Sequence, residues 1–186
     1  MKRFLIAVLG LVVFAALGGV GLAQGNPRGI SKLDLKGKVV SVEYGRPSLR
    51  GRTVQQLLEQ LKPGDFWRLG ADKSTTFSTG LDLAFGDVTI PAGEYSLWAR
   101  READNTWKLV FNKQHGQWGT QHDAAQDFAA VPLKEAKALR GLEMLTIGLG
   151  QVAYGDGTKG EDAVIYIEWG DLWLGKNFVI RGAQTR

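Results

Sequence analysis

Residues Val39–Thr76 read VVSVEYGRPSLRGRTVQQLLEQLKPGDFWRLGADKSTT, and most of the unusual residues of the chain gather in this stretch. It begins with an alternation in which Val40, Val42 and Tyr44 fall on one face, the pattern of a half-buried β-strand. An arginine-rich turn, an amphipathic helix and a second turn with polar and aromatic residues follow. We therefore expect the rest of the chain to be organised around this stretch.

One helix is predicted inside this stretch. Its apolar side chains recur at helical spacing, at Val54, Leu57, Leu58 and Leu61. Thr53 is a favourable N-cap, and Gln56 three residues later completes a capping box. Pro63 cannot continue the helical hydrogen-bond ladder, so the helix should end before Pro63–Gly64. We expect this short helix to lie across one open end of a sheet assembly.

Downstream of Gly70 the sequence reads almost entirely as short strands. Apolar and polar residues alternate, as in Tyr95–Ala99 and Leu145–Leu149, and turn residues recur often. This spacing is typical of antiparallel sandwiches and barrels. The alternation argues against a parallel α/β sheet, whose strands are buried on both faces. The predicted fold is all-β with one or two short helices, a single-domain antiparallel β-sandwich or barrel-like fold over residues 35–182.

Local patterns in the second half add detail to this prediction. Asp127–Leu133 reads as a further strand, and Lys134–Arg140 could form a helical turn. Gln151–Asp162 is rich in glycine and reads as a flexible loop. The last two strand-like segments, Ala163–Trp169 and Leu172–Ile180, are predicted to form a hairpin around the intervening glycine and aspartate.

The first residues have the three parts of a secretory signal peptide. A basic start precedes an apolar run over residues 4–20, and Gly21-x-Ala23 suits signal peptidase. A membrane anchor is the alternative, since the apolar run approaches a bilayer-spanning length. We expect cleavage of residues 1–23, a flexible lead-in at residues 24–34 and no membrane contact afterwards. The protein is accordingly expected to be periplasmic or secreted.

Composition narrows the functional classes. The chain has 23 Lys and Arg against 19 Asp and Glu, and loss of Lys2 and Arg3 with the signal would leave an excess of only two positive charges. Such a small excess gives no case for nucleic-acid binding. The chain has no cysteine, which excludes disulfides and lipid attachment at a cysteine. Stability must therefore come from burial and hydrogen bonding.

An arginine group is the first candidate for a functional surface. Arg46, Arg52 and Arg68 lie in or beside the two turns of the opening stretch. Arg50 and Lys73 are close to them in sequence. Guanidinium groups bind carboxylate or phosphate in bidentate geometry, so this group could form an anion pocket. The alternative is that the arginines pair with nearby carboxylates and clamp irregular loops.

Tryptophan is the second candidate. The chain has six tryptophans. Trp107 and Trp169 are in phase with apolar strand positions and are predicted to pack in the core. Trp67, Trp98 and Trp118 are the candidates for exposed indoles, which can stack on sugar rings or cations.

The group His115, His122 and Asp123 is the third candidate. Two histidines and a carboxylate can bind a metal or supply a base and the group that orients it. The spacing of the histidines matches no recognised metal motif, and the sequence contains no nucleophile elbow, phosphate loop or calcium loop. We therefore expect no metal and no cofactor, and the sequence assigns no catalytic residue.

Three motifs occur in order along the chain: Y-G-R-P-S at residues 44–48, W-R-x-G-A at residues 67–71 and P-A-G-x-Y-S-L at residues 91–97. Together with Phe111-Asn112-Lys113 they make the chain resemble a bacterial exported family called domain of unknown function 2911. The resemblance runs over nearly the whole chain after the signal. It implies an exported, single-domain β protein, and it supplies no function.

Three functional hypotheses follow. The first is an exported, non-catalytic binding module for a small anionic or polar ligand or a glycan. Its site would form where the Arg46–Arg52 turn meets Trp67–Arg68 and the Trp118–Asp123 loop. The second is an envelope hydrolase or lyase with His122 or Asp72 as base and an arginine as charge stabiliser, and the third is a structural or interaction domain. The candidate ligand-binding residues are Arg46, Arg52, Trp67, Arg68, Asp72, Asn112, Trp118, His122 and Asp123.

Overall fold

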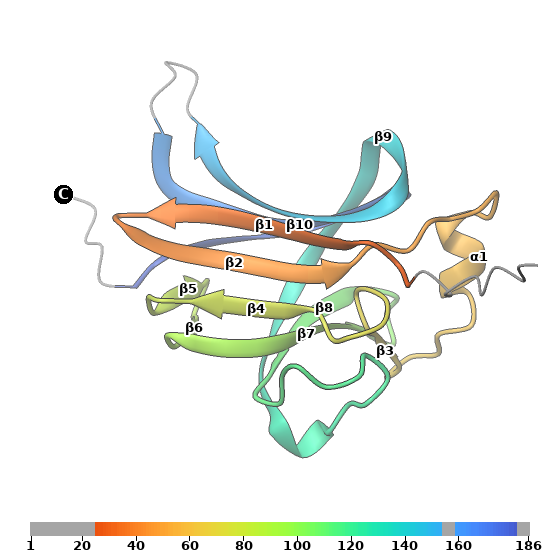
Figure 1. The fold of residues 1–186 in the computed structure, drawn as a ribbon, viewed down its shortest axis with the longest axis horizontal. Helices are drawn as coiled ribbons and strands as arrows, with labels where there is room; N and C mark the ends of the chain where they lie inside the picture. Colours follow the sequence, from red (N-terminus) through yellow and green to blue (C-terminus); the bar gives the residue numbers. More distant parts are fainter. Residues whose placement is uncertain (1–24, 154–158, 182–186) are drawn as a thin grey trace, which may run out of the picture.

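In the computed structural model the described residues are 25–153 and 159–181. Strands dominate this part of the chain (Figure 1). The elements are β1 (Arg28–Leu35), β2 (Lys38–Gly45), α1 (Val54–Leu58), β3 (Phe66–Trp67), β4 (Thr76–Thr79), β5 (Leu83–Phe85), β6 (Val88–Ile90), β7 (Gly93–Arg101), β8 (Trp107–Asn112), the 3₁₀ turn η1 (Ala124–Gln126), β9 (Asp127–Ala153) and β10 (Lys159–Ile180).

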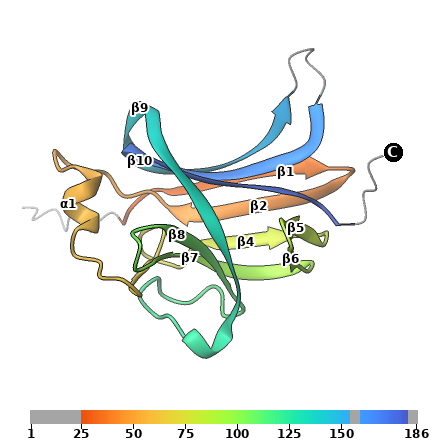
Figure 2. The same ribbon diagram turned by 180° about the vertical axis from the view of Figure 1, so that it is seen from behind.

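All strand pairings are antiparallel, and the sheet order is β1-β2-β4-β7-β8-β9-β10-β5-β6, with β3 added to β7. The sheet curves so that β9 and β10 cross over β1 and β2, while β4, β7 and β8 form the opposite layer (Figures 1 and 2). The predicted all-β, antiparallel, sandwich-like fold is therefore confirmed.

An aromatic cluster fills the space between the layers. Phe77 of β4 and Phe111 of β8 lie edge to face at 5.6 Å between ring centroids. Phe85 of β5 stacks on Phe178 of β10 at 4.9 Å and contacts Phe111 at 5.1 Å. All four rings are fully buried. Because β4 and β5 stand far apart in the sheet order, these contacts show that the two layers close on a shared core.

Strands β9 and β10 pass through both layers by bending together. On one side of Gly170, Ala163–Glu168 of β10 pairs with Thr146–Gln151 of β9. On the other side, Leu172–Gly175 pairs with Lys134–Lys137. The register shifts on both sides of Gly170, which has φ of +56°. A glycine with positive φ suits such a β-bulge, which bends a strand without ending it.

This continuity corrects three predictions. Residues 163–180 belong to one strand with a bulge, so the predicted final hairpin around Gly170–Asp171 is wrong. Residues 134–140 are part of β9, so the predicted helical turn is also wrong. The predicted loop at 151–162 is wrong at its ends, where β9 reaches Ala153 and β10 starts at Lys159. The stretch between those two residues lies outside the described residues.

The segment expected as a flexible lead-in contains an eight-residue strand. Strand β1 pairs with β2 from Arg28 opposite Gly45 to Leu35 opposite Lys38. Ser31 accepts a hydrogen bond through its hydroxyl from the backbone N–H of Leu149 at 2.9 Å. The prediction of a flexible lead-in is therefore wrong from Arg28 onward, and the proposed signal at residues 1–23 lies outside the described residues.

Helix α1 lies at one end of the assembly, opposite the end that carries β5 and β6 (Figure 1). The Thr53 hydroxyl accepts from the Gln56 backbone N–H, and the Gln56 side chain accepts from the Thr53 N–H, so the predicted capping box is present. Gln55 Nε2 donates to Oδ1 of Asp171 at 2.6 Å, which ties the helix to β10. The helix ends at Leu58, earlier than predicted.

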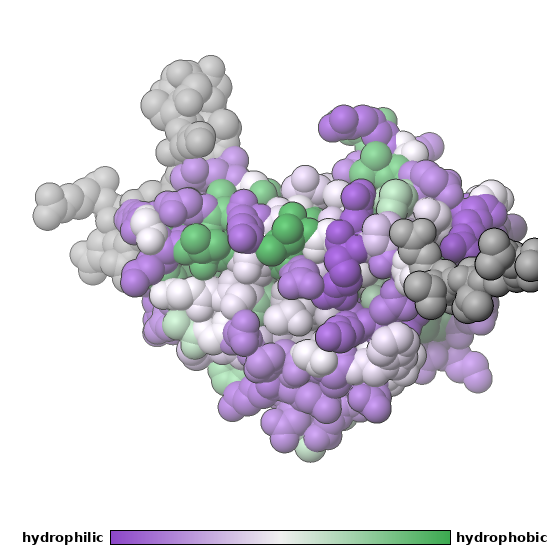
Figure 3. Space-filling view, in the orientation of Figure 1, coloured by the Kyte–Doolittle hydropathy of each residue, from purple (hydrophilic) through white to green (hydrophobic). Residues whose placement is uncertain are grey.

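The surface is mostly hydrophilic, with small hydrophobic patches on the face seen in Figure 3. The exposed large hydrophobic residues of the described part are Ile30, Val39, Trp118, Phe128 and Leu139. No helix in the described residues is both long and apolar enough to span a membrane.

Candidate functional site

A pocket opens beside α1, where the turn before the helix, the strand β3 and the loop between β8 and β9 meet. Its volume is about 530 Å³. Four of the nine residues predicted from the sequence line it, namely Arg52, Trp67, Arg68 and His122. They come from the three segments that the sequence hypothesis brought together. We call this cavity the arginine pocket.

The inner wall of the arginine pocket consists of tryptophan. Trp67 and Trp169 are stacked, with ring centroids 6.0 Å apart and planes 14° from parallel. Trp98 also lines the pocket, and its indole N–H donates to the Ser96 hydroxyl at 3.0 Å. All three indoles are buried. The prediction that Trp67 and Trp98 are exposed platforms is therefore wrong, because both indoles are buried.

Leucines from α1 and the turn after it provide the opposite wall. Leu57, Leu58 and Leu61 line the pocket, and Leu58 is buried. The helical stripe in the sequence predicted that these residues face inward together. Leucine and tryptophan side chains therefore supply much of the pocket's apolar lining.

The charges at the pocket have one sign. Its ionisable lining residues are Arg52, Arg68 and His122, and no carboxylate lines it. Arg52 donates through Nε to the Leu49 carbonyl at 2.9 Å, which leaves its two terminal nitrogens without a partner in the described part of the chain. The Arg68 side chain has no hydrogen bond or ion pair with any described residue. Two guanidinium groups are therefore available to an anion.

His122 is held rigidly at the edge of the pocket. Its Nε2 lies 2.8 Å from Oδ1 of Asp127. Its ring contacts both Phe66, at 4.1 Å between centroids, and Trp98, at 4.7 Å. When the imidazole is neutral, Nε2–H donates to Asp127 and Nδ1 is left as an acceptor. Asp127 orients the histidine, and sequence reasoning missed it because it lies five residues away at the start of β9.

Three predicted residues, Arg46, Asp72 and Asn112, do not line the pocket, and their side chains form hydrogen bonds that stabilise the fold. Arg46 donates from Nε to the Leu145 carbonyl at 3.2 Å and from Nη2 to the Thr146 hydroxyl at 3.3 Å. These bonds clamp the end of β2 to β9, so Arg46 is a structural clamp, although its partners are a carbonyl and a hydroxyl and not the carboxylates that the alternative expected.

Asp72 and Asn112 stabilise loops. Oδ2 of Asp72 accepts from the backbone N–H of Asn26 at 3.0 Å. Asn112 is fully buried, and its Nδ2 donates to the Asp123 carbonyl at 2.8 Å and to Oδ1 of Asp127 at 2.7 Å. Asn112 is therefore closed to a ligand, and Asp72 holds the Asn26 backbone through one of its two carboxylate oxygens.

The last two predicted residues lie near the pocket and outside its lining. Trp118 is 52% exposed, and its backbone forms a bridge with Lys73. Asp123 caps η1 by accepting from the backbone N–H of Ala125 at 3.0 Å. Trp118 is the one predicted indole that is open to solvent.

Of the comparisons with known proteins, only the one with family models gives a match. A family model described as "Protein of unknown function (DUF2911)" matches residues 26–175. No curated protein and no solved structure gives a significant match. Within the described residues, no group of three or more His, Cys, Asp or Glu side chains could hold a metal ion.

Proposed function

Because the chain belongs to the family DUF2911, whose description names no activity, we propose a function from the arginine pocket itself. The protein is a binding module for a small organic anion that carries a flat apolar body, such as an aromatic carboxylate or phosphate. We place this activity outside the cytoplasm, in line with the signal expected at residues 1–23.

The observation that carries the proposal is that the arginine pocket combines an apolar lining with basic side chains and no acidic one. Arg52, Arg68 and His122 are its ionisable residues, and none of its lining residues is acidic. A guanidinium that lacks a carboxylate partner is well suited to bind a carboxylate or phosphate with two parallel hydrogen bonds. The apolar walls would exclude water from the ligand body. An uncharged glycan would leave both guanidinium groups without a counter-charge, so we favour an anion.

A second candidate function is hydrolysis or elimination on the bound anion. His122 supports it, because a histidine oriented by a carboxylate at a pocket edge has the geometry of a general base. Asp72, the other base considered from the sequence, accepts from Asn26 and does not line the pocket. Incubation of each bound compound with the protein, followed by product analysis, separates turnover from simple binding.

The experiment is a thermal-shift screen on the purified protein followed by calorimetry. The panel contains phenyl phosphate, benzoate and indole-3-acetate, the neutral benzamide, and inorganic phosphate. Arg52→Gln and Arg68→Gln test the pocket, and Arg140→Gln is the control, since Arg140 is exposed and does not line the pocket. A ligand that binds the native state raises the melting temperature by mass action.

We expect the aromatic anions to raise the melting temperature and benzamide to leave it unchanged. Loss of either pocket arginine should weaken the anion about tenfold or more, since hydrogen bonds to charged groups contribute about 1.5–3 kcal/mol. Arg140→Gln should bind like the parent. If no anion binds the parent, or if both pocket variants bind as tightly as Arg140→Gln, the proposal is wrong.

A further inference from the structure

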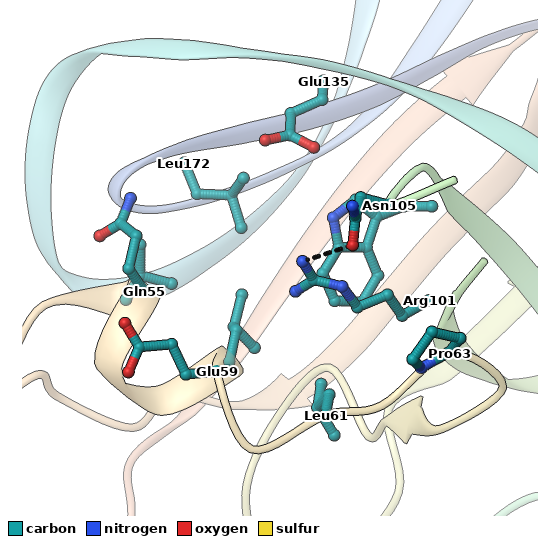
Figure 4. Close-up of a pocket in the computed structure, with 11 residues that line it drawn as sticks. Gln55, Glu59, Leu61, Pro63, Arg101, Asn105, Glu135 and Leu172 are labelled. Atoms are coloured by element: carbon teal, nitrogen blue, oxygen red, sulfur yellow. Dashed lines mark hydrogen bonds between the residues drawn. The ribbon is translucent and has the colours of Figure 1, made fainter. Parts of the chain in front are cut away.

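A second cavity lies on the other side of α1, with a volume of about 580 Å³. Figure 4 shows its lining residues. One wall comes from α1 and the turn after it, and the others come from the β7–β8 hairpin, β9 and β10. Its charged lining residues are Glu59, Arg101 and Glu135. We call it the carboxylate pocket, and the argument for it is independent of the function proposed above.

Arg101 is fixed in this pocket by neutral partners. Its Nη2 donates to Oδ1 of Asn105 at 3.1 Å, and its Cζ lies 5.5 Å from the centroid of the Trp107 ring. The backbone of Arg101 is tied to the turn after α1, since the Gly64 N–H donates to the Arg101 carbonyl at 2.7 Å. The guanidinium is therefore held in place with most of its donors still free.

Neither carboxylate of the pocket neutralises Arg101. Glu135 reaches into the cavity from β9, Arg101 reaches in from β7, and Glu59 lies beside Gln55 on the helix side (Figure 4). Within the described residues, no ion pair involves Glu59, Arg101 or Glu135. Gln55 donates from Nε2 to Asp171 at 2.6 Å, and no hydrogen bond from it to Glu59 or Glu135 is formed within the described residues.

Charges that share a pocket and stay apart leave room for a ligand that satisfies each of them. Arg101 matches one carboxylate on a ligand, and Glu59 and Glu135 match two cationic groups. The formal charge of the three side chains is one negative unit. A basic amino acid carries two cations and one carboxylate, so it complements the pocket both group by group and in net charge. We propose that the carboxylate pocket binds a free basic amino acid.

The test is calorimetry with L-lysine and analogues that each lack one charged group. Cadaverine lacks the carboxylate, norleucine lacks the side-chain ammonium, and 6-aminohexanoate lacks the α-ammonium. Glu135→Gln and Glu59→Gln remove one carboxylate each, and Arg101→Gln removes the guanidinium. Asp87→Asn is the matched control, because Asp87 is exposed in the β5–β6 turn and does not line the cavity. Urea unfolding of every variant shows that it is folded.

We expect lysine to bind and each analogue to bind about tenfold or more weakly, the loss that follows from one charged hydrogen bond. Glu135→Gln and Arg101→Gln should lose a similar factor, and Asp87→Asn should bind like the parent. Trp107 fluorescence should change on binding, since the indole lies under the guanidinium that receives the ligand.

Three outcomes overturn the inference. The first is that lysine gives no heat with the parent protein. The second is that norleucine binds as tightly as lysine. The third is that Glu135→Gln and Glu59→Gln both bind lysine as tightly as Asp87→Asn does. If a divalent cation binds the pocket while lysine does not, the carboxylates serve a metal instead. None of these results bears on Arg52 and Arg68, so the function proposed for the arginine pocket stands or falls separately.

Discussion

Nε2 of His122 lies 2.8 Å from Oδ1 of Asp127, and the same carboxylate oxygen accepts from Nδ2 of Asn112 at 2.7 Å. One carboxylate oxygen therefore joins the buried end of β8, the start of β9 and the edge of the arginine pocket. The His122 ring contacts Phe66 and Trp98, so its orientation also shapes the aromatic wall.

Substitution Asp127→Ala should lower the free energy of unfolding by about 1–3 kcal/mol, because it leaves buried donors without an acceptor. Urea unfolding followed by tryptophan fluorescence measures this change. Asp87→Ala, at an exposed turn, is the control and should unfold like the parent. Equal midpoints for Asp127→Ala and the parent would show that the shared oxygen contributes nothing to stability.

Substitution Gly45→Ala should destabilise the fold by steric overlap. A Cβ at Gly45 would lie 2.1 Å from the backbone carbonyl oxygen of Ala71, which cannot rotate away. Forced backbone shifts of this kind typically cost about 1–3 kcal/mol. Gly141→Ala is the matched control, since a Cβ there meets no atom within 4 Å. Gly45→Ala should therefore be less stable than Gly141→Ala in both thermal and urea unfolding. Similar stabilities of the two variants would contradict the close approach at Gly45.

Arg46→Ala should weaken the fold and leave the arginine pocket intact. Arg46 holds the end of β2 against β9 through Leu145 and Thr146, so we expect a loss of about 1–3 kcal/mol in urea unfolding. Anion affinity measured by calorimetry well below the melting temperature should match the parent. Lost affinity with unchanged stability would instead place Arg46 in the binding site.

Stability at acid pH should depend on Glu102. The hydrogen bond from Arg100, with smaller help from Lys108, holds the pKa of Glu102 below its ordinary value of 4.5, although burial opposes the shift. The stabilisation is fully present above pH 4.5 and is lost as the pH falls through the lowered pKa. Glu102→Gln should therefore show a shallower loss of stability below that pH. Urea midpoints measured across the acid range test this, and identical slopes for variant and parent would contradict it.

The sequence was sufficient for features that arise from local chemistry. Alternating side chains predicted an antiparallel β fold, because a half-buried strand needs that period whatever it pairs with. Thr53 and Gln56 predicted a capping box, since both partners lie within one turn. The meeting of the Arg52 turn, Trp67–Arg68 and the loop that carries His122 also followed from polar and aromatic residues gathered in turns.

Other features depend on partners far along the chain. Strand β1 was missed because its inward positions include Gly29 and Ser31, and Ser31 is satisfied there by the backbone of Leu149. Residues 134–140 have helical composition, but pairing with β10 overrides that preference. Gly170 marks a bulge where a turn was expected, and positive φ serves either structure. The roles of Arg46 and Arg52 could not be told apart from the sequence either. Which of them binds other strands and which lines the pocket depends on the residues that the fold places next to each one.

Leu58 and Leu61 line both the arginine pocket and the carboxylate pocket. The two cavities therefore share a partition formed by α1 and the turn after it, and a helix of five residues is too short to be stable away from its contacts. A ligand that shifts this partition changes the affinity of the other cavity for its own ligand. Thermodynamic linkage requires the reverse effect to have the same factor and sign. Titration of one ligand in the presence of the other would then show whether binding at the two pockets is coupled.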